Sequence, residues 1–328
     1  VQGNIAAIIG GCFGHSNLIT EYKYGLPSNG TMSHSYIQAF GVGAEAEKEA
    51  FVTFIKHRRQ RKSNSLILLV DTYDTIHIGI ENAIKAFKEC GIDDSYEGIY
   101  GVRLDSGDLA YQSKKCRKRF DEEGFTKAKI TLTNALDEQL IRSLREQGAC
   151  VDMYGVGDAI AVSKSYPCFG GVYKIVELDE EPLIKISGDV IKISNPGFKE
   201  VYRIFDKEGL AYADLISLVK NDSDKEKLLN NENFIIRDEK YDFKSSLIEK
   251  DKYTFTKLTK EYIKDGKIDK KLYDELFDIM KSQKHYFDSL AKVSEERKRL
   301  ENPHSYKVDL SSDLIELKYG LINKIKNV

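Results

Sequence analysis

The segment Arg103–Asp108, of sequence RLDSGD, has the residue types of a small-molecule binding site. Its arginine can bind a carboxylate or a phosphate through two parallel hydrogen bonds. The carboxylate of Asp105 can bind sugar hydroxyls or Mg²⁺, which prefers oxygen ligands. Residues two apart on a strand point to the same face, so we expect Arg103 and Asp105 to enter one cavity. From the residues alone, a structural Arg–Asp ion pair at a helix start explains the segment equally well.

A second polar segment, SNGTMSHS, contains Thr31, Ser33 and His34. A lone histidine is more often structural than catalytic, but His34 is expected at a strand-to-helix junction, where ligands commonly bind. Imidazole can also act as a nucleophile and form a phosphohistidine. The segment VDTYDT adds Asp71 and Asp74. We expect Asp71 to lie at the end of a strand, on the same side of the fold as Arg103 and His34. We expect Asp74 to cap a helix.

Two pairs of glycines, Gly155 with Gly157 and Gly170 with Gly171, follow later in the chain. Glycine lets backbone amides approach a phosphate closely, and the late loops of an α/β barrel often bind phosphate. Turns also need glycine, so each pair by itself is a weak signal.

The elements that must position these residues alternate between strands and helices. Five runs are expected as strands: LPSNGTM at 26–32, LILLVDT at 66–72, GIYGVRLDSG at 98–107, KITLTNA at 129–135 and VDMYGVG at 151–157. Asp108 and Asp137 mark helix starts between them, and Gly91, Gly124 and Gly148 mark helix ends. This alternation predicts βαβ units and a parallel sheet, with ligands at the carboxyl ends of the strands. No G-x-G-x-x-G sequence opens the first unit, so we favour a barrel over a dinucleotide-binding sheet.

The sequence changes character after Gly171. The short alternating runs VYKIVEL, EPLIKIS, VIKIS and EVYRIF predict antiparallel strands. From about Lys220 the chain is rich in charged residues, and we expect a long helix from about Asp269 to Leu300. We therefore predict an α/β barrel catalytic domain at residues 1–171, and a domain of β-hairpins followed by helices at residues 172–328.

The composition is that of an ordinary globular protein. The chain has 328 residues, of which 41% are hydrophobic, and a net charge of −2. This balance indicates neither a nucleic-acid partner nor a membrane surface, and no apolar run reaches the ~18 residues of a membrane span. The cysteines are scattered without a C-x-x-C pair: Cys12, Cys90, Cys116, Cys150 and Cys168. We interpret them as reduced thiols of a cytoplasmic protein.

Taken in order, six segments resemble nicotinate phosphoribosyltransferases. They are GTMSHSY, LLVDTYDT, GVRLDSGDLAY, NALDEQLI, GVGDAIAVSKSYPCFGGVYKIV and NPHSYKV. The resemblance implies an α/β fold, the irregular α/β barrel of type II phosphoribosyltransferases, with a second mixed α/β domain. It also implies transfer of a phosphoribosyl group from phosphoribosyl pyrophosphate to nicotinate, giving nicotinate mononucleotide and pyrophosphate, with ATP as co-substrate and Mg²⁺ as cofactor.

The resemblance also implies roles for single residues. His34 matches the histidine that ATP phosphorylates, and we expect it to be catalytic together with Asp71 and Asp105. Thr31 and Arg103 match residues that contact nicotinate. Asp105 matches a residue that binds the ribose hydroxyls, and the expected phosphoribosyl pyrophosphate segments contain Gly155, Gly157, Asp158, Gly170 and Gly171. At Asp158-Ala159-Ile160 the family commonly has Thr or Glu followed by Arg-Leu, so a positive charge is missing from this loop. No metal ligand is assigned.

Two alternatives remain open. One is a nicotinamide phosphoribosyltransferase, because an arginine can also donate to an amide oxygen. The other is an inactive, truncated paralogue that binds nucleotides or partners. The chain does not begin with Met, and the family carries a further N-terminal portion. We therefore expect a piece of a longer protein that is a homodimer when complete.

Overall fold

The computed structural model describes residues 1–61, 65–188, 192–238, 241 and 244–326. The chain forms two compact units, Val1–Phe169 and Gly170–Val328, each described by itself below. The predicted domain division after residue 171 lies close to the boundary between these units. Within the described residues, no helix is both long and apolar enough to cross a membrane.

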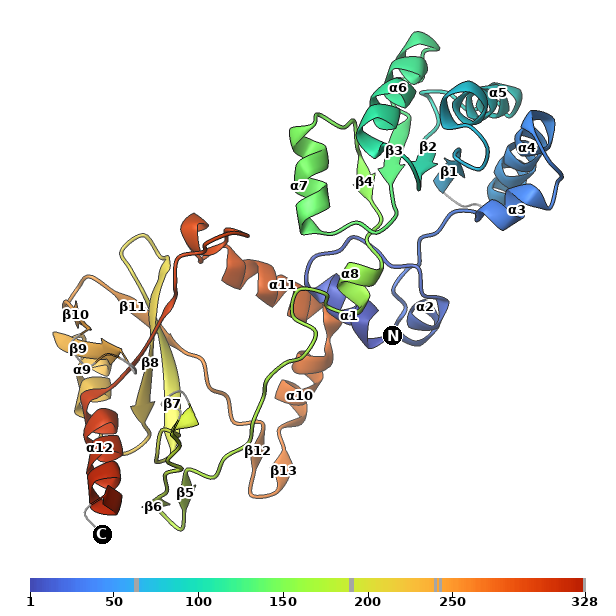
Figure 1. The fold of residues 1–328 in the computed structure, drawn as a ribbon. Coiled ribbons are helices and arrows are strands. Elements are labelled where there is room, and N and C mark those ends of the chain that lie inside the picture. The colour runs from blue at the N-terminus through green and yellow to red at the C-terminus, as the bar shows by residue number, and fades with distance from the viewer. Residues whose placement is uncertain (62–64, 189–191, 239–240, 242–243, 327–328) are drawn as a thin grey trace. The chain divides into compact units, whose positions relative to one another are not determined.

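The first unit is an alternation of helices with a four-stranded parallel sheet (Figure 1). Four helices precede the first strand in the described part of the sequence, and the last of them is the longest: α1 (Gln2–Ile9), α2 (Leu18–Tyr24), α3 (His34–Gln38) and α4 (Ala44–Gln60). The strands are β1 (Ser65–Leu69), β2 (Ile99–Leu104), β3 (Lys129–Leu132) and β4 (Met153–Tyr154). Between and after them lie the π-helix η1 (Thr75–Gly79), α5 (Ile80–Glu89), α6 (Leu109–Glu122), α7 (Glu138–Glu146) and α8 (Asp158–Ala161).

The helix ends follow the signals in the sequence. The side chains of Asp108 and Asp137 accept backbone N–H groups at the starts of α6 and α7. Gly91, Gly124 and Gly148 have positive φ just past the ends of α5, α6 and α7. In each case the following residue donates back to the last turn, which is the hydrogen-bond pattern of a glycine-stopped helix. These local signals therefore fix the lengths of the helices around the sheet.

The core of this unit lies between the strands and the helices α4, α5 and α6. Leu66, Leu68, Val102 and Ile130 are fully buried and belong to one apolar cluster with residues of these helices. At Gly79, the last residue of η1, an added Cβ would lie 1.8 Å from the Val70 carbonyl oxygen. Only glycine permits this close approach, which packs η1 against the chain that leaves β1.

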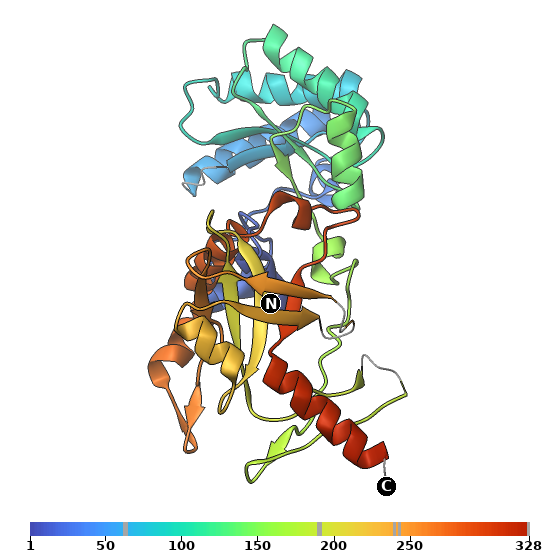
Figure 2. The same ribbon diagram turned by 90° about the vertical axis from the view of Figure 1, so that its left-hand side faces the viewer.

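The second unit is built on a mixed six-stranded sheet of order β10-β9-β14-β8-β7-β11. Figure 2 shows its strands in yellow to orange-red from a second direction. Its strands are β7 (Lys199–Phe205), β8 (Ala211–Leu218), β9 (Phe234–Asp238), β10 (Ser245–Ile248), β11 (Thr254–Lys257) and β14 (Lys307–Leu310). Helices α9 (Ser223–Leu229) and α12 (Ser312–Lys326) contact each other and strands β8 and β9. Two small hairpins, two helices and one short 3-10 helix complete the described part of the unit: β5 (Glu177–Leu178), β6 (Glu181–Pro182), β12 (Ile263–Lys264), β13 (Lys267–Ile268), α10 (Lys270–Phe277), α11 (Ile279–Leu290) and η3 (Glu295–Arg297).

Several predicted elements are wrong. Residues 26–32 form no strand and make only an isolated bridge between His15 and Ser28. The expected helix from Asp269 to Leu300 is broken, because Asp278 ends α10 in extended backbone and caps α11. The charged region after Lys220 contains strands of the main sheet. Only the short β5 and β6 form within the runs VYKIVEL and EPLIKIS, whereas the run EVYRIF lies within β7. The run VIKIS spans residues 190–194, of which residues 190 and 191 fall outside the described residues.

Candidate functional site

The carboxyl ends of the parallel strands meet at one edge of the sheet. Leu69 pairs with Arg103, and Leu104 pairs with Leu132, which pairs with Tyr154. The hydrogen bonds between the strands continue one residue past the ends of β1, β3 and β4. There the backbone N–H groups of Val70, Thr133 and Gly155 each donate to a carbonyl of the neighbouring strand. The register therefore brings the residues that follow β1, β2, β3 and β4 to the same edge.

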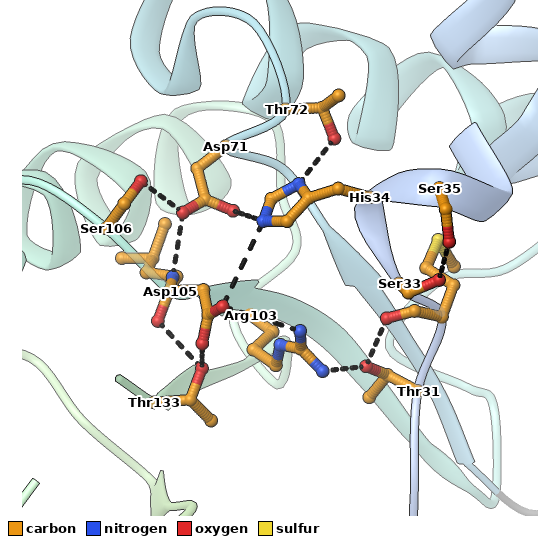
Figure 3. Close-up of polar contacts among 12 residues, drawn as sticks. Thr31, Ser33, His34, Ser35, Asp71, Thr72, Arg103, Asp105, Ser106 and Thr133 are labelled. Carbon is orange, nitrogen blue, oxygen red and sulfur yellow. Dashed lines mark hydrogen bonds and ion pairs between the residues drawn. The ribbon is translucent and has the colours of Figure 1, made fainter. Parts of the chain in front are cut away.

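His34 lies over this edge as the first residue of α3 (Figure 3). Met32 and Ile37, on either side of it in sequence, are buried in the core and fix the segment in place. The His34 Nδ1 atom lies 3.0 Å from the Thr72 hydroxyl. Its Nε2 atom faces two carboxylates, at 3.8 Å from Asp71 Oδ1 and 3.9 Å from Asp105 Oδ2. The two nitrogens of His34 thus have different surroundings.

Asp71 is the buried carboxylate of the group, with 2% of its side chain exposed. Its Oδ2 atom accepts the backbone N–H of Asp105 at 2.9 Å and the hydroxyl of Ser106 at 2.6 Å. Its Oδ1 atom is buried and accepts no hydrogen bond from the described residues. Asp71 therefore links the end of β1 to the end of β2 and presents one unsatisfied oxygen to His34.

Arg103 points toward the same edge and holds the loop before α3. Its Nη1 atom donates to the Thr31 hydroxyl at 2.5 Å, and its Nη2 atom lies 3.9 Å from Asp105 Oδ2. The Nε atom is buried without a hydrogen-bond partner among the described residues. Asp105 is oriented from its other side, because the Thr133 hydroxyl donates to its Oδ1 atom.

The glycines expected to hold phosphate are placed differently from one another. An added Cβ at Gly155 would lie 2.6 Å from the Thr133 side chain, so Gly155 packs beside the residue that orients Asp105. Gly157 and Asp158 follow it at the start of α8. Gly170 and Gly171 are exposed and begin the second unit. The structure thus brings Gly155 to the strand edge, and the roles of all five residues stay predictions.

The structure groups Thr31, His34, Asp71, Arg103 and Asp105, although they come from three separate segments (Figure 3). It adds three hydroxyl residues for which no role is predicted above: Thr72, Ser106 and Thr133. All three lie at predicted strand ends, and that position was the available signal. Asp74 caps η1 by accepting the N–H groups of Ile76 and His77, as expected.

Asp105 is the residue that fits a bound Mg²⁺ ion best. Among the described residues, no three His, Cys, Asp or Glu side chains gather into a metal site of their own. Mg²⁺ often binds through one or two carboxylates and completes its shell with water and substrate phosphates. Asp105 has 31% of its side chain exposed, and its Oδ2 atom lies beyond hydrogen-bond distance of Arg103 and His34. One free carboxylate oxygen suits an ion shared with a phosphate ligand.

Comparison with known sequences points to one family. Residues 198–318 match the model of the nicotinate phosphoribosyltransferase C-terminal domain. Over 340 residues the chain is 35% identical to a nicotinate phosphoribosyltransferase of Bacillus subtilis, covering 99% of this chain and 63% of that protein. A nicotinate phosphoribosyltransferase of Caenorhabditis elegans is 28% identical, covering 95% and 62%. The chain thus spans less than two thirds of the length of these relatives.

Solved structures share the fold. The crystal structure of human nicotinic acid phosphoribosyltransferase matches with a TM-score of 0.73 and 21% identity, covering 97% of this chain and 66% of that one. The nicotinate-nucleotide pyrophosphorylase of Pyrococcus furiosus matches with a TM-score of 0.57, covering 88% and 61%. These matches confirm the predicted fold class, an irregular α/β barrel with a second mixed α/β domain. By sequence, the chain is similar to nicotinate phosphoribosyltransferases along nearly its whole length, and residues 198–318 match the model of their C-terminal domain.

Proposed function

We propose that the first unit carries the site at which a phosphoribosyl group passes from phosphoribosyl pyrophosphate to nicotinate, with help from ATP. One observation carries this proposal. The imidazole of His34 faces the carboxylates of Asp71 and Asp105 at the same strand edge where Arg103 holds Thr31. The group therefore combines a nucleophile, a sugar-binding carboxylate and an anion-binding guanidinium.

Nicotinate would bind through its carboxylate to Arg103. The Nη1 atom is already engaged by Thr31, and the buried Nε atom is unpartnered in the described part of the chain. A buried donor without an acceptor costs free energy, and a ligand carboxylate would remove that cost. The edge of the guanidinium formed by Nε and Nη2 is suited to two parallel hydrogen bonds to a carboxylate.

The phosphoribosyl group would bind next to this carboxylate. Asp105 would accept the ribose hydroxyls through Oδ2, while Thr133 holds Oδ1. The backbone at Gly155 and Gly157 would approach the phosphate, since an amide without a side chain beside it can come close to an oxyanion. In the transfer, the nicotinate ring nitrogen forms a bond to the sugar carbon as the bond to pyrophosphate breaks.

Alignment and charge stabilisation would supply the catalysis. The sugar acquires positive character and the leaving pyrophosphate gains negative charge, so oriented carboxylates and amides lower the barrier. Mg²⁺ held by Asp105 and the diphosphate would neutralise part of that charge. No protein nucleophile is needed for this step, which leaves His34 for a separate reaction with ATP.

His34 would take the γ-phosphoryl group of ATP on Nδ1. The two carboxylates near Nε2 favour the tautomer with the proton on that nitrogen, and they repel a phosphate there. In that tautomer Nδ1 carries the electron pair that accepts the Thr72 hydroxyl and that would attack the phosphoryl group. Attack releases ADP, and hydrolysis of the phosphohistidine returns His34 and phosphate. Binding the substrates better in one state than in the other would couple ATP use to transfer.

A pair of matched substitutions tests the two halves of the site. Thr31→Val removes the acceptor that orients Arg103, and Thr133→Val removes the donor that orients Asp105. We expect Thr31→Val to weaken nicotinate binding and Thr133→Val to weaken phosphoribosyl pyrophosphate binding, each about tenfold, as for the loss of one hydrogen bond to a charged group. Each variant should leave the other ligand's affinity within about twofold of wild type.

Calorimetric titration of each ligand into both variants gives the comparison directly. Losses that are equal for the two ligands in both variants would show that the two threonines do not divide the site as proposed.

A further inference from the structure

A second buried carboxyl lies on α4, the helix that contacts α3, β1 and η1. Glu47 is in the first turn of α4 and is fully buried, beside the core residues Ala50 and Phe51. The Asn82 amide donates to its Oε2 atom at 3.0 Å and to the Ala44 carbonyl at 2.8 Å. The Oε1 atom of Glu47 is buried without a hydrogen-bond partner, as is Oδ1 of Asp71. Two carboxyls inside the first unit therefore each keep one unsatisfied oxygen.

No cation compensates Glu47 in the described part of the chain. The charged residues of the elements around it have other partners or point to solvent. On α5 and nearby, Glu81 pairs with Arg119, Lys88 with Glu123 and Glu89 with Lys48, while Lys85 is exposed. On the other elements, His77 of η1 pairs with Asp74 and His34 of α3 contacts Thr72. Strand β1 has no charged residue. Asp71 is the charged group that bears on Glu47, and it is negative.

The physical chemistry of this arrangement favours the uncharged form of Glu47. Burying a carboxylate without a cation is costly, and a neighbouring carboxylate adds to the cost. The N-terminal turn of α4 favours a negative charge, but that effect is smaller than the cost of burial. Burial raises the pKa of Glu47 to about 7, the Asn82 hydrogen bond opposes this rise and the charge of Asp71 adds to it.

We propose that Glu47 is a positioning residue of the site, held as an uncharged acid so that it adds no second negative charge to that of Asp71. When Glu47 ionises, a second negative charge adds to that of Asp71, which faces Nε2 of His34. That charge repels anionic ATP. The consequence for ATP rests on the proposed function of His34, whereas the protonation of Glu47 does not.

Infrared spectroscopy tests the protonation without any activity. At about pH 6, below the raised pKa, the wild-type chain should show the C=O stretch of a buried protonated carboxyl that exchanges slowly. Glu47→Gln should lack this band, and it should fade in the wild type as the pH rises past 7. Glu49→Gln is the matched control, since Glu49 lies two residues along the same helix and is exposed. A band that Glu47→Gln leaves unchanged would overturn the proposal.

The pH dependence of phosphorylation tests the effect on the site. We expect the second-order rate of His34 labelling by ATP to be equal in wild type and Glu47→Gln at about pH 6, and roughly fivefold lower in wild type at about pH 8.5, the order expected for partly screened charges. A structural role alone would lower the rate equally at every pH, and parallel profiles would contradict the proposal. Glu49→Gln should follow the wild type.

Two further outcomes are also informative. If Glu47→Gln fails to fold, Glu47→Met removes the same charge. It should likewise lack the infrared band and the decrease in the labelling rate at alkaline pH. If ATP labels neither protein at any pH, the coupling role proposed for His34 fails. The infrared band then decides alone whether Glu47 is held as an acid.

Discussion

Replacing His34 with alanine is expected to abolish phosphorylation of the protein by ATP. The chain should take up phosphate from labelled ATP in a form that is labile in acid and stable in alkali, as N-phosphates are. His34→Ala should take up none and should lose the stimulation of transfer by ATP. Slower, ATP-independent transfer should remain, because Arg103 and Asp105 still hold the proposed substrates. Label bound to the protein, measured under alkaline conditions, and product formation with and without ATP give the two results.

His77→Ala is the control for this experiment. Like the site residue Asp71, His77 follows β1 in the sequence, but its side chain is largely exposed and pairs with Asp74, the cap of η1. It has no role in the proposed reaction. It should be labelled like the wild type. We further expect the phosphate on Nδ1 of His34, which nuclear magnetic resonance of the labelled protein can distinguish from Nε2. A label that persists in His34→Ala would place the phosphorylated residue elsewhere.

Substituting Arg103 is expected to change the choice between nicotinate and nicotinamide. A charge-assisted pair with the nicotinate carboxylate contributes on the order of 1.5–3 kcal/mol, or roughly ten- to a hundredfold in affinity. Arg103→Ala should lower kcat/KM for nicotinate by at least this factor and affect nicotinamide much less. Arg103→Lys keeps the charge but loses the planar pair of donors, so its loss should be smaller but clear.

The measurement is kcat/KM for both substrates in wild type, Arg103→Lys, Arg103→Ala and Arg145→Lys. Arg145 is exposed on α7 and serves as the control for a charge-conserving change. Equal losses for the acid and the amide would mean that Arg103 orients the ring or the sugar in general. Selectivity for the acid would then have to come from another residue, such as Thr31.

The strand ends of the first unit could be predicted because their signals are local. The runs that became β1, β2 and β3 are rich in branched apolar residues, and polar residues follow each of them. The parallel arrangement places those residues on one edge, so Asp71, Arg103 and Asp105 were expected together. Their hydrogen bonds were not predictable, because the link from Asp71 to Asp105 depends on the pairing of Leu69 with Arg103.

The segment before α3 shows that predicted site residues can lie together even where the predicted strand is wrong. Residues 26–32 form no strand, yet Thr31 contacts Arg103, the other residue that we expect to bind nicotinate. The position of the loop comes from two buried anchors, Met32 and Ile37, and from the arginine itself. Such tertiary contacts join residues far apart in the sequence, and no local pattern contains them.

Glu47 is the clearest residue that the sequence did not single out. It lies in AEAEKEA, a charged stretch that is typical of a solvent-exposed helix. Its spacing offers a signal, since Glu47 precedes the buried Ala50 and Phe51 by three and four residues and so shares their helix face. A carboxylate on an apolar face indicates either a buried partner or a raised pKa.

Incubation with unlabelled substrates gives the most direct test of the proposed reaction. The protein, nicotinate, phosphoribosyl pyrophosphate, Mg²⁺ and ATP are mixed, and the products are separated and identified by mass. We expect nicotinate mononucleotide and pyrophosphate in equal amounts, with little product when nicotinamide replaces nicotinate. Folded protein that binds both substrates but forms no nicotinate mononucleotide, or that prefers the amide, would contradict the proposed function.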